Sequence, residues 1–303
     1  PLWALTEIEA CLDVDDREQA LTLAGRLLPF WQRNHSVADT SLLEIALRVA
    51  ARLDDRDLAG ALLAPFRLGL ATAAVVPSLV GLLGVYGEAW CRALLQCWLH
   101  EGGVHEEASR AQLDWIASGL AHTCRAYVAA DGRTLAGWLL DDRWIWLRKH
   151  ADSVCGQPHV RQRAEALPTL GRPLLAVLAA SLIVDRTDLH AEVLRAFDGA
   201  LPMEAALGVL HAAHDDRHEC APAGLGLAAL HARCAQELET RLAAPARARD
   251  DWSIRMPAGC TCELCVTLDG FLRAPGEARR EWPLAEGKRQ HVHRAIDSRD
   301  LPV

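Results

Sequence analysis

Thr40-Ser-Leu-Leu-Glu-Ile-Ala-Leu-Arg-Val-Ala-Ala-Arg-Leu53 is followed by Asp54-Asp55 and then by a second apolar run that ends at Phe66. In both runs, apolar residues recur at i, i+3, i+4 and i+7, which is the spacing of one face of an α-helix. An Asp at the break can cap the helix that follows it. Residues 40–66 therefore predict a hairpin of two helices.

The same pattern continues from Leu2 to about Leu242, with short breaks at Asp, Gly or Pro, such as Asp15-Asp16. No clean period near 34 or 40 residues and no repeat consensus is found. We expect an all-α fold, an α-solenoid-like array of antiparallel helix pairs that forms a scaffold over residues 1–244. The expected helices span 4–13, 16–30, 40–53, 55–66, 85–100, 109–129, 132–150, 160–167, 171–184, 187–198, 202–214 and 223–243.

The composition agrees with packed helices. Hydrophobic residues make up 51% of the 303 residues and aromatic residues only 5%, so a β-sandwich is disfavoured. The formal net charge of −8 provides no global attraction for nucleic acid or an anionic membrane. The basic residues are almost all Arg, since Lys149 and Lys288 are the only lysines, which is typical of a high-GC bacterial genome.

The sequence shows no secretion signal, and the nearest approach to a membrane span, Leu70 to Leu83, is short and interrupted by Pro77 and Gly81. We expect no membrane contact. Seven of the ten cysteines are scattered through apolar helical patterns, so a reducing cytoplasm is the expected location. The chain begins at Pro1 and can be a piece of a longer protein.

The segment Pro245 to Asp251 breaks the helical periodicity with a proline and charges, which predicts a boundary before a second unit at residues 251–303. About fifty residues offer too small a core for stability without support, and a structural metal is the usual remedy. The array and this unit are therefore expected to be separate domains.

This unit contains Cys260-Thr-Cys262-Glu-Leu-Cys265, followed later by His291-Val-His293. Thiolates and imidazoles are the ligands of structural zinc, and Cys-x-x-Cys lets two sulfurs reach one ion. We expect helices at about 262–272 and 284–296. Because residues two apart on a helix point in nearly opposite directions, only one histidine should reach the ion. The pattern predicts a structural Cys3His zinc site.

Three alternatives stay open for these thiols. A redox Cys-x-x-Cys motif would use them without a metal, although the βαβ context of thioredoxin-like proteins is absent. Three ligands instead of four would leave an open position on the metal for water or a substrate. The cysteines could also be ordinary core residues.

Two further groups are weaker candidates. A basic face beside the cysteines could grip phosphate or RNA, or could be a solvated face of mixed charge. A second ionisable cluster is better interpreted as a polar helix end and turn, although it formally contains the His-x-Asp of iron(II) oxygenases. Trp138, Trp144 and Trp146 are expected in the core rather than on a stacking surface. The basic face consists of Arg279, Arg280, Lys288, Arg289 and Arg294, and the cluster consists of His211, His214, Asp215, Asp216, His218 and Glu219.

The C-terminal stretch combines Cys260-x-Cys262-x-x-Cys265, Leu268-x-x-Phe271-Leu272-x-x-Pro275, Trp282-Pro283-Leu284-Ala285 and Arg289-x-His291-x-His293. This combination resembles the cysteine-rich tail of large bacterial and fungal proteins of the prolyl-hydroxylase-like 2-oxoglutarate and iron(II) oxygenase family. The resemblance covers about fifty residues. It implies that the three cysteines and one of the histidines match the family's metal ligands. It does not transfer catalysis, because the iron-binding facial triad and its β-fold are absent.

No nucleotide-binding loop and no nucleophile elbow is present. We therefore expect a non-catalytic helical scaffold with a structural zinc module, serving protein or peptide interaction or substrate positioning. One alternative is the accessory C-terminal region of an oxygenase whose catalytic domain lies outside this chain. The other is nucleic-acid binding through the basic zinc module.

Overall fold

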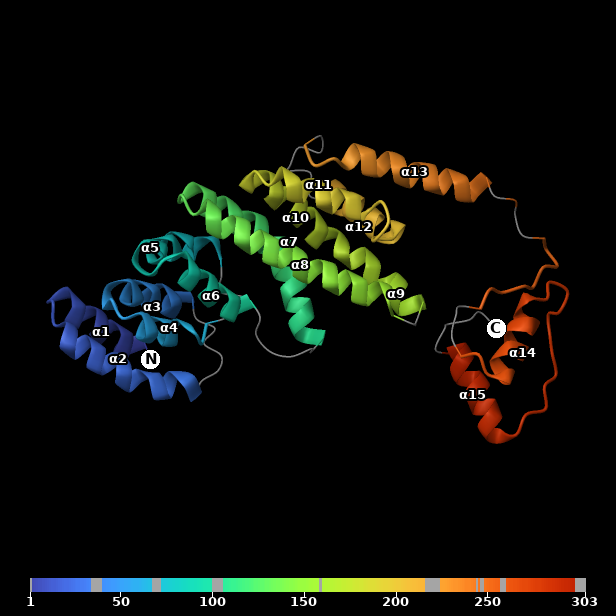
Figure 1. Ribbon diagram of the computed structural model, residues 1–303, viewed down its shortest axis with the longest axis horizontal. Helices are drawn as coiled ribbons and strands as arrows, with labels where there is room; N and C mark the ends of the chain where they lie inside the picture. The colour runs from blue at the N-terminus through green and yellow to red at the C-terminus, as the bar shows by residue number, and fades with distance from the viewer. Residues whose placement is uncertain are drawn as a thin grey trace.

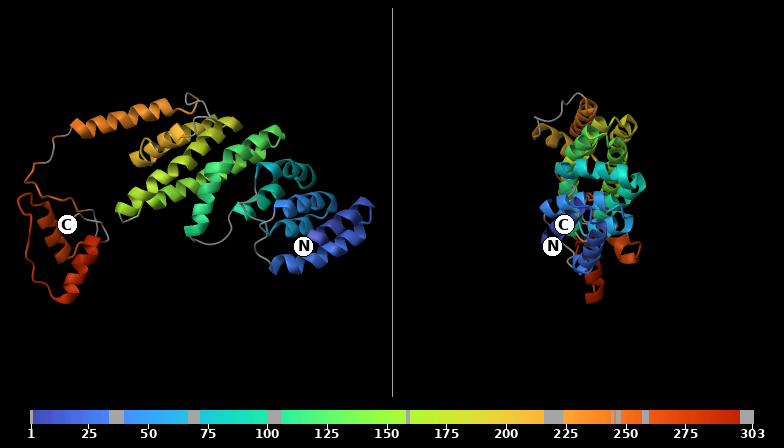
Figure 2. Two further views of the ribbon diagram at one scale, coloured as in Figure 1. Left: turned by 180° about the vertical axis from the view of Figure 1, so that it is seen from behind. Right: turned by 90° about the vertical axis from the view of Figure 1, so that its left-hand side faces the viewer.

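A computed structural model describes residues 2–33, 40–66, 72–99, 106–157, 160–215, 224–243, 245, 248–256 and 260–297. These residues form helices and no strands, so the predicted all-α class is confirmed. The helices follow one another along the long axis of the molecule, with the C-terminal unit at one end (Figures 1 and 2). The helices of the first part are α1 (Leu2–Asp13), α2 (Arg17–Arg33), α3 (Thr40–Leu53), α4 (Arg56–Leu63), α5 (Val76–Tyr86), α6 (Glu88–Leu99), α7 (Glu106–Ala129) and α8 (Arg133–Cys155). The remaining helices are α9 (Val160–Ala166), α10 (Gly171–Val184), α11 (Thr187–Ala196), α12 (Met203–Asp215), α13 (Leu227–Ala243), α14 (Glu263–Arg273) and α15 (Glu286–Asp297), with short 3-10 turns η2 (Ala73–Val75) and η3 (Leu167–Leu170).

Four helical hairpins share one turn device. Asp15, Asp54, Asp131 and Asp185 each adopt a positive φ of 52° to 65° within two residues of the end of the first helix of a pair. Asp tolerates this left-handed conformation better than most residues because its short side chain can bond locally. At three of the turns the next backbone N–H donates to a carbonyl five residues back, as from Arg186 to Ser181 at 2.8 Å. This is the bond that closes a Schellman helix end. The Asp residues at the breaks in the apolar pattern therefore terminate one helix, in addition to their expected role of capping the next.

The first two hairpins lie side by side and are joined by a ladder of ion pairs. Arg48 on α3 donates to Glu9 on α1 at 2.7 Å, and Arg52 pairs with Asp13 at 2.5 Å. In each pair the partners are separated by 39 residues in the chain. Corresponding faces of successive hairpins therefore meet here, although no period near this length stands out in the sequence.

The structure corrects the prediction between residues 70 and 100. The apolar pattern predicts no helix at 76–86 and one helix at 85–100. Instead α5 ends at Tyr86, Gly87 turns the chain with a φ of +83°, and α6 begins at Glu88. Pro77 lies in the first turn of α5, where a helix has no use for the missing N–H. The proline marks a start here and not an interruption.

Helix α10 is the most buried helix of the array, and it packs against α7, α8, α11 and α12. The stretch Arg161–Val184, which includes it, is long and apolar enough to cross a membrane by length and composition, so it replaces Leu70 to Leu83 as the nearest approach to a span. Of its most apolar window, 72% is buried inside the protein. Such burial is typical of the core helix of a soluble protein.

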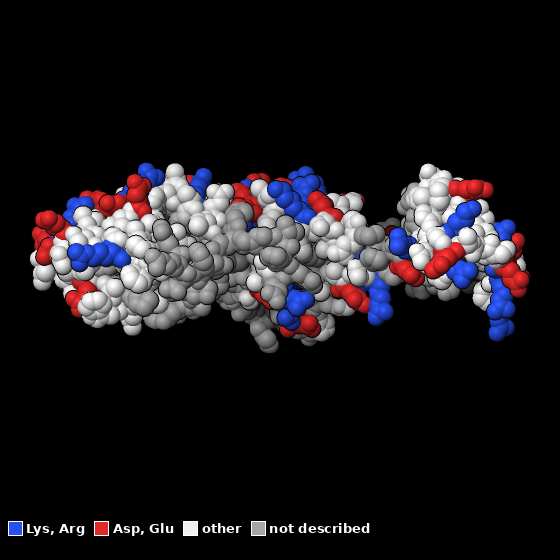
Figure 3. All heavy atoms as spheres, turned by 90° about the horizontal axis from the view of Figure 1, so that it is seen from below, with Lys and Arg blue, Asp and Glu red and all other residues white. Residues whose placement is uncertain are grey.

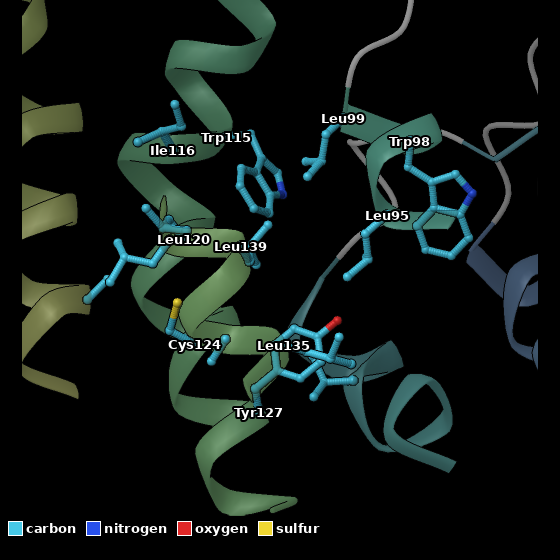
Figure 4. Packing of buried hydrophobic residues seen from close by; sticks show 14 of the residues in the cluster. Leu95, Trp98, Leu99, Trp115, Ile116, Leu120, Cys124, Tyr127, Leu135 and Leu139 are labelled. Atoms are coloured by element: carbon cyan, nitrogen blue, oxygen red, sulfur yellow. The ribbon is translucent and has the colours of Figure 1, made fainter. Parts of the chain in front are cut away.

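Buried side chains tie successive hairpins together. Figure 4 shows Leu95 and Leu99 of α6 on the side that faces α7 and its Trp115, whereas Trp98 points to the opposite side, where its ring packs edge-on against Phe66. The indole N–H of Trp98 donates to the carbonyl of Leu63 at 2.8 Å, so the polar atom of this buried ring is satisfied. These contacts belong to one hydrophobic cluster that extends from Leu5 to Cys234.

A second cluster lies entirely within the C-terminal unit. Its buried members are Met256, Cys265, Leu268, Leu272, Val292 and Ala295. The cysteines and histidines of the C-terminal unit lie around this small core.

Candidate metal centre

Helix α14 positions two of the three thiols. Cys262 is its N-cap residue, with extended backbone angles, and the carbonyl of Cys262 accepts the first helical bond from Val266 at 2.9 Å. Cys265 follows in the first turn and is 2% exposed. A cap residue and a residue three positions later lie on the same side of a helix start. The Cys-x-x-Cys spacing therefore directs both sulfurs to one point.

Helix α15 brings a histidine to that point. The Nε2 atom of His291 lies 3.2 Å from the Sγ atom of Cys262 and 3.2 Å from the Sγ atom of Cys265. Cys260, which precedes α14 in the chain, completes the group. The ligand atoms of these four residues all lie within 4.8 Å of one another. The sequence-predicted cysteines and one predicted histidine thus meet in one cluster.

The second histidine points elsewhere. His293 is exposed and does not belong to the cluster, whereas His291 is half-buried and the intervening Val292 is buried in the small core. Burial of Val292 sets the rotation of α15 about its own axis. That rotation turns His291 toward α14 and His293 toward solvent.

A short backbone pairing joins the segment before the cysteines to the C-terminal end of α14. The N–H of Trp252 donates to the carbonyl of Pro275 at 2.9 Å, and the N–H of Ile254 donates to that of Leu272 at 2.5 Å. Ile254 and Met256 thereby pack against α14. This support was not predicted, although the alternation of Trp252, Ile254 and Met256 in the sequence is a signal for an extended segment.

The surroundings shift the pKa values of two neighbouring thiols in opposite directions. The backbone N–H of Cys265 and the thiol of Cys260 stabilise the thiolate of Cys262 and lower its pKa to about 6. Burial and the neighbouring thiols raise the pKa of Cys265 to about 11. Without a bound cation, the cluster of cysteines readily accommodates only one thiolate. A bound cation would favour the thiolate at all three cysteines.

The donor set fits a tetrahedral metal ion. For zinc, bond lengths of about 2.3 Å to sulfur and about 2.0 Å to nitrogen place neighbouring ligand atoms about 3.7 Å apart. The observed limit of 4.8 Å and the two S···N distances of 3.2 Å bracket that value. Soft thiolates with one imidazole favour zinc over magnesium or calcium. The group could therefore hold a metal ion with four protein ligands.

The predicted basic face is exposed throughout. In the same unit, between residues 248 and 297, acidic and basic residues are equal in number. Arg273 is paired with Asp269 at 2.9 Å, and Arg289 donates to the carbonyl of Leu284 at 3.2 Å. The unit as a whole therefore carries no excess of positive charge. The exposed side chains are Arg279, Arg280, Lys288, Arg289 and Arg294.

The other candidates do not form a site among the described residues. His211 and His214 are exposed near the C-terminal end of α12 and belong to no metal-capable group there. Asp216, His218 and Glu219 lie outside the described residues. The tryptophans are confirmed as core: Trp144 is 4% exposed, and Trp138 and Trp146 pack against the large cluster.

No protein-family model, no curated protein and no solved structure was found to match this chain.

Proposed function

We propose that the chain is a non-catalytic helical scaffold whose C-terminal module is folded by structural zinc and that it serves protein or peptide interaction or substrate positioning. The single observation that carries the zinc part is the convergence of Cys260, Cys262, Cys265 and His291. Four protein ligands leave no coordination position for water or a substrate, so the metal has a structural role.

The size of the module supports that role. Its core consists of a few side chains from α14, α15 and the segment before them. A core this small contributes too little to hold two short helices together against their conformational entropy. Because the unfolded segment has no preformed site, the free energy of zinc binding becomes free energy of folding.

The scaffold part of the proposal is an α-solenoid-like arrangement of residues 1–244. It is supported by the repeated left-handed Asp at four hairpin turns and by the ion-pair ladder between α1 and α3. Stacked hairpins present extended surfaces, which repeat proteins commonly use for binding. The expected partner is a protein or peptide in the cytoplasm.

The accessory role in an oxygenase stays a prediction. The metal ligands that the resemblance implies are the three cysteines and one of His291 and His293, and the cysteines lie together with His291. A neighbouring coding segment with His-x-Asp and a distal His on predicted strands would support this role. Nucleic-acid binding is not favoured, because the charges of the module are balanced.

Elemental analysis of the purified chain tests the metal proposal. We expect one zinc per chain in the parent protein and none after combined replacement of Cys260, Cys262 and Cys265 by Ser. Seven other cysteines stay in place in that variant, so nonspecific thiol binding would persist. Absence of zinc from the parent protein purified without chelators, and after zinc addition, would refute the structural-zinc proposal.

A further inference from the structure

The outer face of α1 exposes large apolar side chains that the array does not use. Trp3 is 72% exposed and Val14, just past the end of the helix, is 76% exposed. Trp3, Glu7, Ala10 and Val14 follow the spacing i, i+4, i+7 and i+11 and so form one stripe. The stripe lies opposite the buried side chains Leu5, Ile8 and Leu12.

The neighbours of α1 leave this stripe uncovered. Helix α1 packs against α2 and α3, and its ion pairs from Glu9 and Asp13 run to α3. All four stripe residues are exposed to solvent. Trp is enriched in protein interfaces relative to the rest of the protein surface.

The charges around the stripe are acidic and uncompensated. Glu7, Asp15 and Glu18 are exposed, and none of them has an ion-pair partner among the residues that the structure describes. The nearby cation Arg17 is bonded to Asp54 at 3.1 Å. Acidic side chains gather at the tip of the molecule that carries α1 and α2 (Figure 3). A partner for this face should therefore carry positive charge.

We propose that the outer face of α1 binds a basic amphipathic helix of a partner protein. The apolar stripe of the partner would cover Trp3, Ala10 and Val14, and Lys or Arg beside that stripe would approach Glu7 and Asp15. Trp3 and Val14 are separated by about 16 Å along the helix axis, which matches roughly three turns of a partner helix. A second copy of the chain fits poorly, because two such faces would bring their Glu7 carboxylates together. The inference rests on the proposed interaction role of the array but not on the zinc site.

Peptide binding to the full chain tests this proposal. The probe is a fluorescein-labelled helical peptide of about 18 residues. It has Leu at i, i+4, i+7 and i+11 and Lys on both flanks of that stripe. One matched peptide replaces Lys with Glu, and another scrambles the Leu positions. Fluorescence anisotropy measures the dissociation constant at low and high salt. Circular dichroism verifies that each protein variant is folded, and sedimentation measures the oligomeric state.

We expect the Lys peptide alone to bind. Trp3→Ala and Val14→Lys should each weaken binding about tenfold or more, since buried aromatic and aliphatic anchors dominate such interfaces. Glu7→Lys should weaken binding and reduce its salt dependence. Leu242→Lys is the matched control, because Leu242 is 85% exposed on α13, and it should leave the dissociation constant unchanged. Binding should also survive treatment with a zinc chelator, which separates this inference from the metal proposal.

Several results would overturn the inference. The first is that the Lys peptide does not bind at a concentration of about 100 μM. The second is that the Glu peptide binds as tightly as the Lys peptide. The third is that Leu242→Lys weakens binding as much as the Trp3→Ala and Val14→Lys variants do. A dimer of the parent chain that Val14→Lys dissociates would also overturn it, because the face would then be covered by a second copy.

Discussion

Gly171 at the start of α10 and Gly208 in α12 approach so closely that a Cβ atom on Gly171 would lie 2.2 Å from the carbonyl carbon of Gly208. A Cβ atom on Gly208 would in turn lie 2.6 Å from the carbonyl oxygen of Pro168. Both obstacles are backbone atoms, which cannot rotate away. The two helices therefore pack at this distance only because both positions are glycine.

Gly171→Ala and Gly208→Ala should each lower the free energy of unfolding by about 3 kcal/mol, because overpacking would force α10 away from α12 in the first variant and α12 away from η3 in the second. Thermal unfolding followed by circular dichroism measures this effect. Gly25→Ala in α2 is the matched control, since a Cβ there meets nothing within 4 Å. It should stabilise the chain by about 0.5–1 kcal/mol through helix propensity. Equal melting temperatures in all three variants would contradict the close approach.

Replacing Asp185 tests the shared turn device. Asp185 is exposed and has a φ of +65°. Asp185→Ala should destabilise the array by about 1 kcal/mol, because a Cβ without a local polar partner disfavours the left-handed region. Asp185→Gly should leave stability unchanged or raise it slightly. Urea unfolding measures the free energy of unfolding of both variants. An Ala variant more stable than the parent chain would show that the turn does not require the left-handed conformation.

The buried Arg143 should make Asp142 indispensable. Arg143 is 0% exposed, its Nε atom donates to Asp142 at 3.0 Å, and burial lowers its pKa. Asp142→Ala would leave a buried charge without this partner, so a loss of about 3–5 kcal/mol is expected in chemical unfolding.

The double variant Asp142→Ala with Arg143→Met checks the reason for that loss. Met keeps much of the apolar volume of the Arg stem without its charge, so the double variant should be more stable than Asp142→Ala alone. If the losses of stability from Asp142→Ala and from Arg143→Met simply add in the double variant, the Asp142–Arg143 pair does not explain the destabilisation by Asp142→Ala.

The two histidines of α15 should differ in their effect on the metal. His291→Ala removes a ligand atom that lies 3.2 Å from two sulfurs, and we expect zinc affinity to fall by about tenfold or more. His293→Ala alters only an exposed side chain and should leave affinity unchanged. Competition with a chromophoric chelator measures both. The opposite order would mean that α15 is rotated relative to the described structure.

Removal of the metal should unfold the C-terminal module and spare the array, because the two hydrophobic clusters share no residue. Limited proteolysis with excess chelator should cleave within residues 251–297 and leave a fragment ending near residue 243. Zinc added back should restore resistance to the protease. Resistance that does not change on chelation would exclude a folding role for the metal.

Much of the helical content could be predicted because helix formation depends on local spacing. The apolar stripe of residues 40–53, for example, matches α3 from end to end. Helix α5 escaped prediction because Pro77 and Gly81 disfavour a helix interior. The proline lies in the first turn, however, and packing of Leu79 and Leu82 outweighs the glycine.

The sequence by itself determined the all-α class and the three clustered thiols, because both follow from residues a few positions apart. Only the tertiary structure decided that His291 and not His293 faces those thiols, since burial of the intervening Val292 sets the rotation of α15. The close approach of Gly171 and Gly208 and the uncovered face of α1 were decided in the same way. Each depends on which surfaces of distant segments meet, and the local periodicity of a chain does not contain that information.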